Sequence, residues 1–174
     1  MSVLVIYESM FGHTKSIAEA AADGLSDALA RGGAHETVTL VPVTDAPETL
    51  PDDITLLVLG GPTHAFSMSR ESTREDALQQ AHVEDASRQS TGLREWIEGA
   101  TTSGSVAVVT FDTRVKKPFI PGSAAKAAAK ALASKGFADV ERGETFWVVD
   151  TAGPLVDGEL ERAREWGASL ADHV

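Results

Sequence analysis

Short apolar runs rich in β-branched residues alternate with alanine-rich stretches along this chain, and this alternation constrains its fold more than any other feature. Each apolar run has the length of a buried strand, whereas the alanine-rich stretches carry apolar residues at helical spacing. Strands that alternate with helices build a parallel sheet with helices on both faces, because each parallel connection crosses over the sheet. The sequence therefore predicts an α/β fold with a doubly wound parallel sheet.

The pattern also places the individual elements. We expect five strands, at Val3 to Tyr7, Thr37 to Val41, Ile54 to Leu59, Ser105 to Phe111 and, with a break or bulge at Arg142-Gly143, from Val140 to Val149. Helices are expected at His13 to Arg31, around Leu93, Trp96 and Ile97, at Ala124 to Lys135 after an N-cap at Ser123, and around Leu160, Ala163, Trp166 and Leu170 after a cap at Asp157. Pro42 to Asp53 is too rich in proline for a long helix, and the polar stretch Ser67 to Ser90 predicts solvated helix with little core surface.

Length, charge and composition limit the kind of protein this chain can be. With 174 residues, 43% of them hydrophobic, residues 1 to 174 are expected to form one domain. The net charge of −11 repels polyanions and makes nucleic acid a poor partner. The lack of cysteine leaves redox chemistry to an organic cofactor. No apolar run suits a membrane span or a signal peptide, so we expect a cytoplasmic protein without a membrane partner.

The segment after the first strand has the features of an anion-binding loop. It reads Glu8-Ser9-Met10-Phe11-Gly12-His13-Thr14 and joins a buried strand directly to a helix. Free backbone N–H groups, the helix dipole and the hydroxyls of Ser9 and Thr14 can hold a phosphate without any arginine. From the spacing alone, a plain strand-to-helix turn capped by Ser9 is an equally good interpretation.

Other binding motifs fit the sequence less well. Gly12-His13-Thr14-Lys15-Ser16 lacks the spacing of a Walker A loop, and no GxGxxG follows a predicted strand. The five histidines, at positions 13, 35, 64, 82 and 173, show no metal-ligand spacing, so no metal site is expected. A hydrolase built on Ser9, His13 and Asp112 is a distant alternative, because a GxSxG elbow is missing, and no catalytic residue is assigned.

Three segments at the ends of predicted strands resemble the cofactor-binding loops of one superfamily. Tyr7 to Thr14 is similar to the FMN-phosphate loop of flavodoxins, and Ser-Met-Phe-Gly-His within it resembles the loop of WrbA-type quinone oxidoreductases. Gly60-Gly61-Pro62-Thr63 resembles the start of the second FMN loop, and Thr110 to Arg114 falls where the third begins. The resemblance covers nearly the whole chain. It implies the flavodoxin-like fold, a five-stranded parallel sheet in the order 2-1-3-4-5 with FMN at its switch point.

The resemblance also implies which residues bind FMN. The first loop would bind the phosphate, and the other two would lie along the two sides of the isoalloxazine ring. The implied FMN-binding residues are Ser9, Met10, Phe11, Gly12, His13 and Thr14 in the first loop, Pro62, Thr63, His64, Ala65 and Phe66 in the second, and Phe111, Asp112, Thr113 and Arg114 in the third. His64 stands where many flavodoxins have a ring-stacking tryptophan, and Phe119 is a candidate for the tyrosine on the other side.

The resemblance implies an FMN-binding flavodoxin-domain protein that acts in electron transfer. The negative net charge suits docking to a basic reductase as redox partner. One alternative is an NAD(P)H:quinone oxidoreductase of the WrbA type, with a small quinone-like acceptor; Phe11-Gly12-His13 favours it, but the glycine-rich third loop of that type is missing. Another is a flavin-free flavodoxin-like scaffold that binds a protein partner through Ser67 to Ser90.

Overall fold

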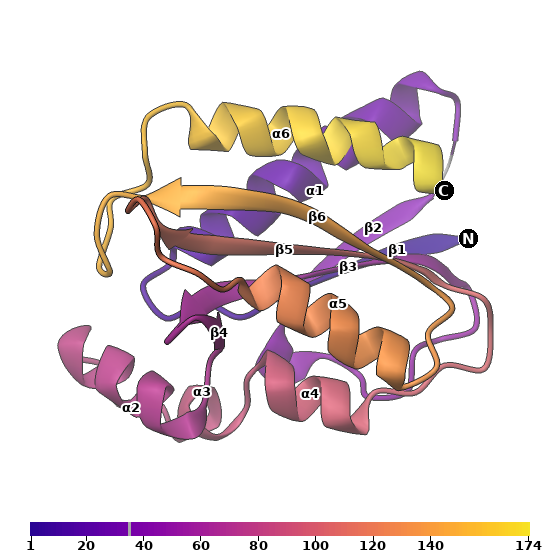
Figure 1. The fold of residues 1–174 in the computed structure, drawn as a ribbon. Coiled ribbons are helices and arrows are strands. Elements are labelled where there is room, and N and C mark those ends of the chain that lie inside the picture. Colours follow the sequence, from indigo (N-terminus) through magenta and orange to yellow (C-terminus); the bar gives the residue numbers. More distant parts are fainter. Residues whose placement is uncertain (35) are drawn as a thin grey trace.

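The chain forms a sheet with helices on both faces (Figure 1). The computed structural model describes residues 1–34 and 36–174, so His35 lies outside the described residues. The strands are β1 (Ser2–Tyr7), β2 (Thr37–Pro42), β3 (Ile54–His64), β4 (Ser67–Met68), β5 (Ala107–Val115) and β6 (Asp139–Val148). The helices are α1 (His13–Arg31), α2 (Glu71–Gln80), α3 (Ala86–Ser90), α4 (Leu93–Gly99), α5 (Ala124–Ser134) and α6 (Glu159–Ser169), with 3₁₀ turns at Val43–Asp45 and Leu170–His173.

The five long strands run parallel in the order β2-β1-β3-β5-β6, which confirms the predicted order 2-1-3-4-5 of the parallel strands. The two-residue β4 was not predicted, and it pairs antiparallel with the end of β3. β3 itself continues past the predicted end at Leu59 to His64. Gly60-Gly61-Pro62 is poor strand sequence, but it stays extended because it pairs with β5 along its length.

Both faces of the sheet are buried, so its strands are apolar throughout. α1 and α6 cover one face, and α4 and α5 cover the other (Figure 1). Within β1, Val3 and Val5 pack toward α1, whereas Leu4 and Ile6 belong to the core beneath α4 and α5. This arrangement leaves the carboxyl ends of the strands and their loops free to form a site.

Several local predictions are confirmed, and two near the C-terminus are wrong. Ser123 caps α5 by accepting a hydrogen bond from the Lys126 N–H, and a register shift in the pairing of β5 with β6 confirms the bulge. α6, however, begins at Glu159 after Gly158 and not after a cap at Asp157. Leu160 was predicted to face the core but is 48% exposed, because the buried face of α6 is formed by Glu159, Ala163 and Gly167.

The polar stretch Ser67 to Ser90 contributes more to the interior than predicted. It forms β4, α2 and α3, and its Met68, Ala77 and Leu78 are buried. Arg74 in α2 has an exposed fraction of 0%, which a solvated helix would not allow. Elsewhere, none of the helices in the described residues is both long and apolar enough to span a membrane.

Candidate functional site

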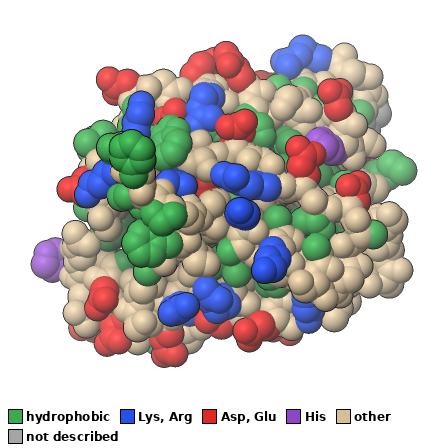
Figure 2. All heavy atoms as spheres, viewed as in Figure 1, with side chains coloured by type: hydrophobic (Ala, Val, Ile, Leu, Met, Phe, Trp, Pro, Cys, Tyr) green, Lys and Arg blue, Asp and Glu red, His purple; other side chains and the backbone are tan. Residues whose placement is uncertain are grey.

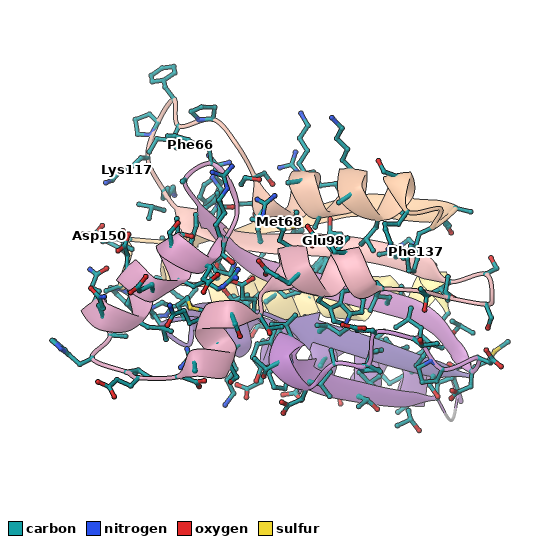
Figure 3. The ribbon with its side chains drawn as sticks, turned by 90° about the horizontal axis from the view of Figure 1, so that it is seen from below. Phe66, Met68, Glu98, Lys117, Phe137 and Asp150 are labelled. Atoms are coloured by element: carbon teal, nitrogen blue, oxygen red, sulfur yellow. The ribbon has the colours of Figure 1, made fainter. Side chains whose placement is uncertain are left out.

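The loops after β1, β3 and β5 meet at the carboxyl edge of the sheet and enclose a groove. Its inner part is a cavity of about 80 Å³ and its outer part a cavity of about 220 Å³. The two parts share Thr63, Arg114, Val115 and Thr151 in their walls. Figure 3 shows Phe66, Lys117 and Asp150, from three different loops, at this same end of the molecule and away from Phe137. The groove is therefore built by segments far apart in the sequence.

The loop between β1 and α1 presents free backbone donors at the inner end of this groove. Gly12 has a φ of 92°, a left-handed conformation suited to glycine, and its N–H donates to Ser9 Oγ at 3.1 Å. The N–H groups of Met10, Phe11, His13 and Thr14 have no hydrogen-bond acceptor among the residues that the structure describes. Unpaired N–H groups at a helix start, together with the helix dipole, favour an anion at this position.

Side-chain contacts hold the β1–α1 loop against the rest of the edge. Thr14 is buried, and its Oγ1 lies 2.7 Å from Thr113 Oγ1 at the end of β5. His13 Nε2 lies 2.9 Å from the carbonyl oxygen of Ala152, in the loop after β6. Because the Thr14 hydroxyl is paired with Thr113, the free donors of this loop are its backbone N–H groups and the Ser9 hydroxyl, which accepts from the Gly12 N–H but donates to no other described residue.

Arg88 in α3 supports the β1–α1 loop from its other side. Its Nη2 donates to the carbonyl oxygens of Ser9 and Met10, at 2.6 and 2.7 Å. A cavity of about 410 Å³ adjoins this contact and is lined partly by Lys15, Thr44 and Arg88. The carbonyl groups of Ser9 and Met10 therefore point toward Arg88, and the backbone N–H groups of the loop point away from it.

A buried polar network backs the wall of the groove that β3 forms. We call Glu8, Ser69, Arg74 and Glu95 the Glu8–Arg74 network. Glu8 accepts a hydrogen bond from Ser69 Oγ and another from the Leu93 N–H at 2.8 Å. Arg74 donates to Ser69 Oγ at 2.9 Å and forms an ion pair with Glu95 at 3.0 Å. Burial raises the pKa of Glu8. The hydrogen bonds from Ser69 and Leu93 and the charge of Arg74 lower it again, but by less than burial raises it.

Burial, together with Arg74 of this network, keeps His64 at the end of β3 neutral. The Nδ1 of His64 lies 3.2 Å from Thr73 Oγ1 in α2. Burial, and secondarily the positive charge of Arg74, lower the pKa of His64 to about 4. His64 is therefore a neutral imidazole near pH 7, and it lines the inner part of the groove.

The structure brings most of the predicted FMN-binding residues together. Residues that line the inner cavity are Ser9, Met10, Phe11, His13, Thr14, Pro62, Thr63, His64, Thr113 and Arg114, and Ala65 and Phe66 line the outer one. Gly12 shapes the first loop but lines neither part of the groove; it lines the cavity of about 410 Å³ beside Arg88 instead. Val115, Val148 and Thr151 were missed, and they could have been found by considering every loop at the carboxyl edge, including the one after β6.

The side chains of Phe111 and Asp112 lie in the interior and not in the groove. Phe111 is 0% exposed and packs edge-on against Trp166, with ring centroids 5.5 Å apart. Asp112 is also 0% exposed, and its Oδ2 accepts hydrogen bonds from Ser123 Oγ at 2.5 Å and from the Ala125 N–H at 3.0 Å. Asp112 thus holds the N-terminus of α5 in place, a function that a loop motif does not reveal. Phe119 is 102% exposed and lines neither cavity.

Charge at the opposite wall comes from Arg114, near the end of β5. Its guanidinium donates to the carbonyl oxygens of Gly122 and Ile120, both at 2.6 Å, and lies 5.3 Å from the ring centre of Trp147. Arg114 thus fixes the loop after β5 and keeps a positive charge beside the groove. Within the described residues, no group of three or more His, Asp or Glu side chains is arranged to hold a metal ion.

Comparisons with known proteins bear on the fold. No protein-family model matches the sequence, and neither does any curated protein. Among solved structures, a flavodoxin from the domain Archaea aligns with a TM-score of 0.63 and 15% identity, over 99% of this chain and 97% of its own. Oxidised flavodoxin 1 from Bacillus cereus aligns with a TM-score of 0.59 and 15% identity, over 100% and 99%. Two-electron reduced flavodoxin from Megasphaera elsdenii aligns with a TM-score of 0.54 and 17% identity, over 96% and 98%. The chain therefore has the flavodoxin-like fold.

Proposed function

We propose that the protein binds FMN in the groove at the carboxyl edge of the sheet and acts in electron transfer. The single observation that carries this proposal is the set of unpaired N–H groups at Met10, Phe11, His13 and Thr14. They lie at the N-terminus of α1 and at the inner end of a groove formed by three strand-end loops, the position at which flavodoxin-like sheets bind their ligands.

The residues present fit the phosphate end of FMN in charge and in donor type. The phosphate would be held by backbone N–H groups of the β1–α1 loop, because Arg114, the one arginine or lysine among the described residues that line the inner cavity, comes from the end of β5. The ring would lie between the end of β3, with the neutral His64, and the end of β5, with Thr113 and Arg114. Both parts of the groove would be used, since small-molecule sites usually measure about 300 Å³ or more.

Bound FMN would supply the one- and two-electron chemistry that the side chains of this cysteine-free chain cannot provide. The protein would bind the cofactor, orient it and tune its charge. Arg114 places a positive charge beside the groove, which favours a negatively charged reduced flavin over the neutral oxidised one. The neutral His64 adds no charge of its own on the other side.

A titration of the cofactor-free protein with FMN tests this proposal, with riboflavin as the control that lacks the phosphate. We expect FMN to bind with quenched fluorescence and riboflavin to bind at least about 100-fold more weakly, because the charge-assisted hydrogen bonds to phosphate are lost. Binding of neither compound would contradict the proposal and favour the flavin-free scaffold.

A second assay separates the carrier from the enzyme. The FMN-loaded protein is mixed with NADH and a soluble quinone, with no other protein present. A carrier is expected to give no turnover above that of free FMN. Turnover by the purified protein alone would favour the quinone oxidoreductase alternative.

A further inference from the structure

One continuous segment of this acidic chain carries positive charge only. Residues 113–138 contain six of the 15 Lys and Arg residues and none of the 26 Asp and Glu residues. The six are Arg114, Lys116, Lys117, Lys126, Lys130 and Lys135. The segment forms the end of β5, the loop after it, and α5.

Four of these cations are exposed, and one of them, Lys116, has an electrostatic partner in Glu159, whose pKa is lowered in small part by Lys116. Lys116, Lys117, Lys126 and Lys130 are exposed, and none forms an ion pair with any residue in the described part of the chain. Figure 2 shows Lys and Arg side chains across the middle of this face, over α5, with most acidic side chains above and below them. The positive charge is therefore local, a band of Lys and Arg side chains within an otherwise acidic surface.

Exposed aromatic side chains adjoin the cations at the mouth of the groove. Phe119 is 102% exposed and Phe66 is 58% exposed. Both have positive φ, 60° and 73°, a conformation that costs free energy for residues other than glycine. The two loops touch, since a Cβ atom on Gly122 would lie 2.0 Å from the Phe66 carbonyl oxygen. Figure 3 shows Phe66 and Lys117 near each other at this end of the molecule.

We propose that this face is the docking surface for an acidic protein. We define the cationic face as Lys116, Lys117, Lys126 and Lys130 together with Phe66 and Phe119. Desolvated aromatic side chains at the centre and charged groups at the rim are typical of protein interfaces, and the rim charges select a partner of opposite sign. The global charge of −11 favours a basic partner, but the local charges that the partner would meet are positive.

The role of this docking surface, electron transfer to or from a partner, rests on the proposed function. Lys117 and Phe66 line the outer part of the groove, so a protein docked there would lie at the exposed edge of the bound ring. The binding itself does not depend on FMN. The two proposals can therefore fail separately.

The soluble domain of cytochrome b5, an acidic haem protein, is a suitable probe, and the basic cytochrome c is its control. The ¹⁵N-labelled protein is titrated with each, in the presence and in the absence of FMN, and followed by NMR. We expect shifts with cytochrome b5 confined to residues 65–66 and 113–138, and affinity about tenfold weaker at about 200 mM salt than at about 20 mM. Tighter binding of cytochrome c, or shifts centred elsewhere, would overturn the proposal, as would tighter binding of a short DNA duplex to the same face.

Matched charge reversals test the surface itself. Lys130→Glu and Arg31→Glu change the net charge equally, and both side chains are exposed, but Arg31 lies at the end of α1, outside the cationic face. We expect Lys130→Glu to weaken cytochrome b5 binding about fivefold and Arg31→Glu less than about twofold. Equal effects would contradict a local docking surface.

The same variants distinguish this inference from the proposed function. Lys130 lines neither part of the groove, so Lys130→Glu is expected to bind FMN as the unaltered protein does. Docking of cytochrome b5 by a protein that fails to bind FMN would overturn the proposed function and leave the docking surface standing. FMN binding without any preference for cytochrome b5 would overturn only the docking surface.

Discussion

The two walls of the groove are held in place in opposite ways. The wall formed by the end of β3 rests on the Glu8–Arg74 network, where a fully buried arginine is satisfied by groups from several segments. The wall formed by the loop after β5 rests on Arg114, which binds two carbonyl oxygens of an exposed loop. The first wall satisfies its charges internally, and the second leaves lysines to the solvent. One wall is therefore suited to fix the environment of a ligand, and the other to meet a partner.

Arg74→Met is expected to have the largest effect of the changes that test this difference. Arg74 donates to Ser69 Oγ and to the Gln89 carbonyl oxygen and pairs with Glu95. Its removal leaves buried acceptors and a carboxylate without their cation, which typically costs about 3 to 5 kcal/mol of unfolding free energy. Chemical denaturation measures this loss.

Arg164→Met is the matched control, because Arg164 pairs with Asp23 and Asp27 at the surface. Surface ion pairs contribute less than about 1 kcal/mol. Similar losses for the two variants would mean that the buried network does not hold the first wall.

The next largest effect is expected from His64, on how the unfolding free energy depends on pH. Its pKa is about 4 in the folded protein, against 6.5 for an unperturbed histidine. As the pH falls below 6.5 the unfolded chain takes up a proton that the folded protein does not, so stability falls until the pH reaches about 4. The loss amounts to about 3 kcal/mol at most.

His64→Gln removes this contribution, and the measurement is the difference in unfolding free energy between variant and unaltered protein at each pH. The difference isolates His64 from Glu8, whose raised pKa acts in the opposite sense, since the folded state then takes up its proton first as the pH falls. Parallel profiles for the two proteins would contradict a buried, neutral His64.

Arg114→Met is expected to have the smallest global effect and a mainly local one. The loss of two exposed or partly exposed hydrogen bonds costs about 1 kcal/mol of unfolding free energy. The loop after β5 loses its main anchor, so trypsin cleavage after Lys116 is expected to become several-fold faster. Unchanged cleavage would show that other contacts hold the second wall.

The fold could be predicted because its signals are local. The apolar runs predicted where the parallel strands lie along the chain, whereas their order in the sheet was implied by the resemblance to flavodoxins. α1 spans the predicted residues His13–Arg31, and Ser123 caps α5 as its position indicates. The three segments at the carboxyl edge could be located for the same reason, but only the first begins as a loop where its apolar run ends. Pro62 to His64 still belong to β3 and Phe111 to Arg114 to β5, because pairing between these two strands continues past the apolar runs. The wrong start of α6 comes from choosing Asp157 as the cap, whereas the chain turns at Gly158 with a φ of 85°.

The buried charges could not be predicted in the same way, because their partners are distant in sequence. Arg74 lies in a stretch so polar that it predicts a solvated helix, and only the folded chain brings it to Glu8 and Glu95. One signal was available: Glu8 directly follows a buried strand, where a carboxylate needs a partner. Asp112 has the same character, since it holds Ser123 and Ala125 across a loop.

The affinity of Ser9→Asp for FMN and riboflavin tests the central claim, that the β1–α1 loop binds a phosphate. Ser9 Oγ accepts from the Gly12 N–H, and a carboxylate can take over that hydrogen bond while adding negative charge to the loop. Ser26→Asp, exposed on α1, is the control of equal charge. We expect Ser9→Asp to lose at least about 100-fold in FMN affinity with riboflavin affinity unchanged, and Ser26→Asp to change neither. FMN binding by Ser9→Asp at the unaltered affinity, or an equal loss for both flavins, would contradict the account.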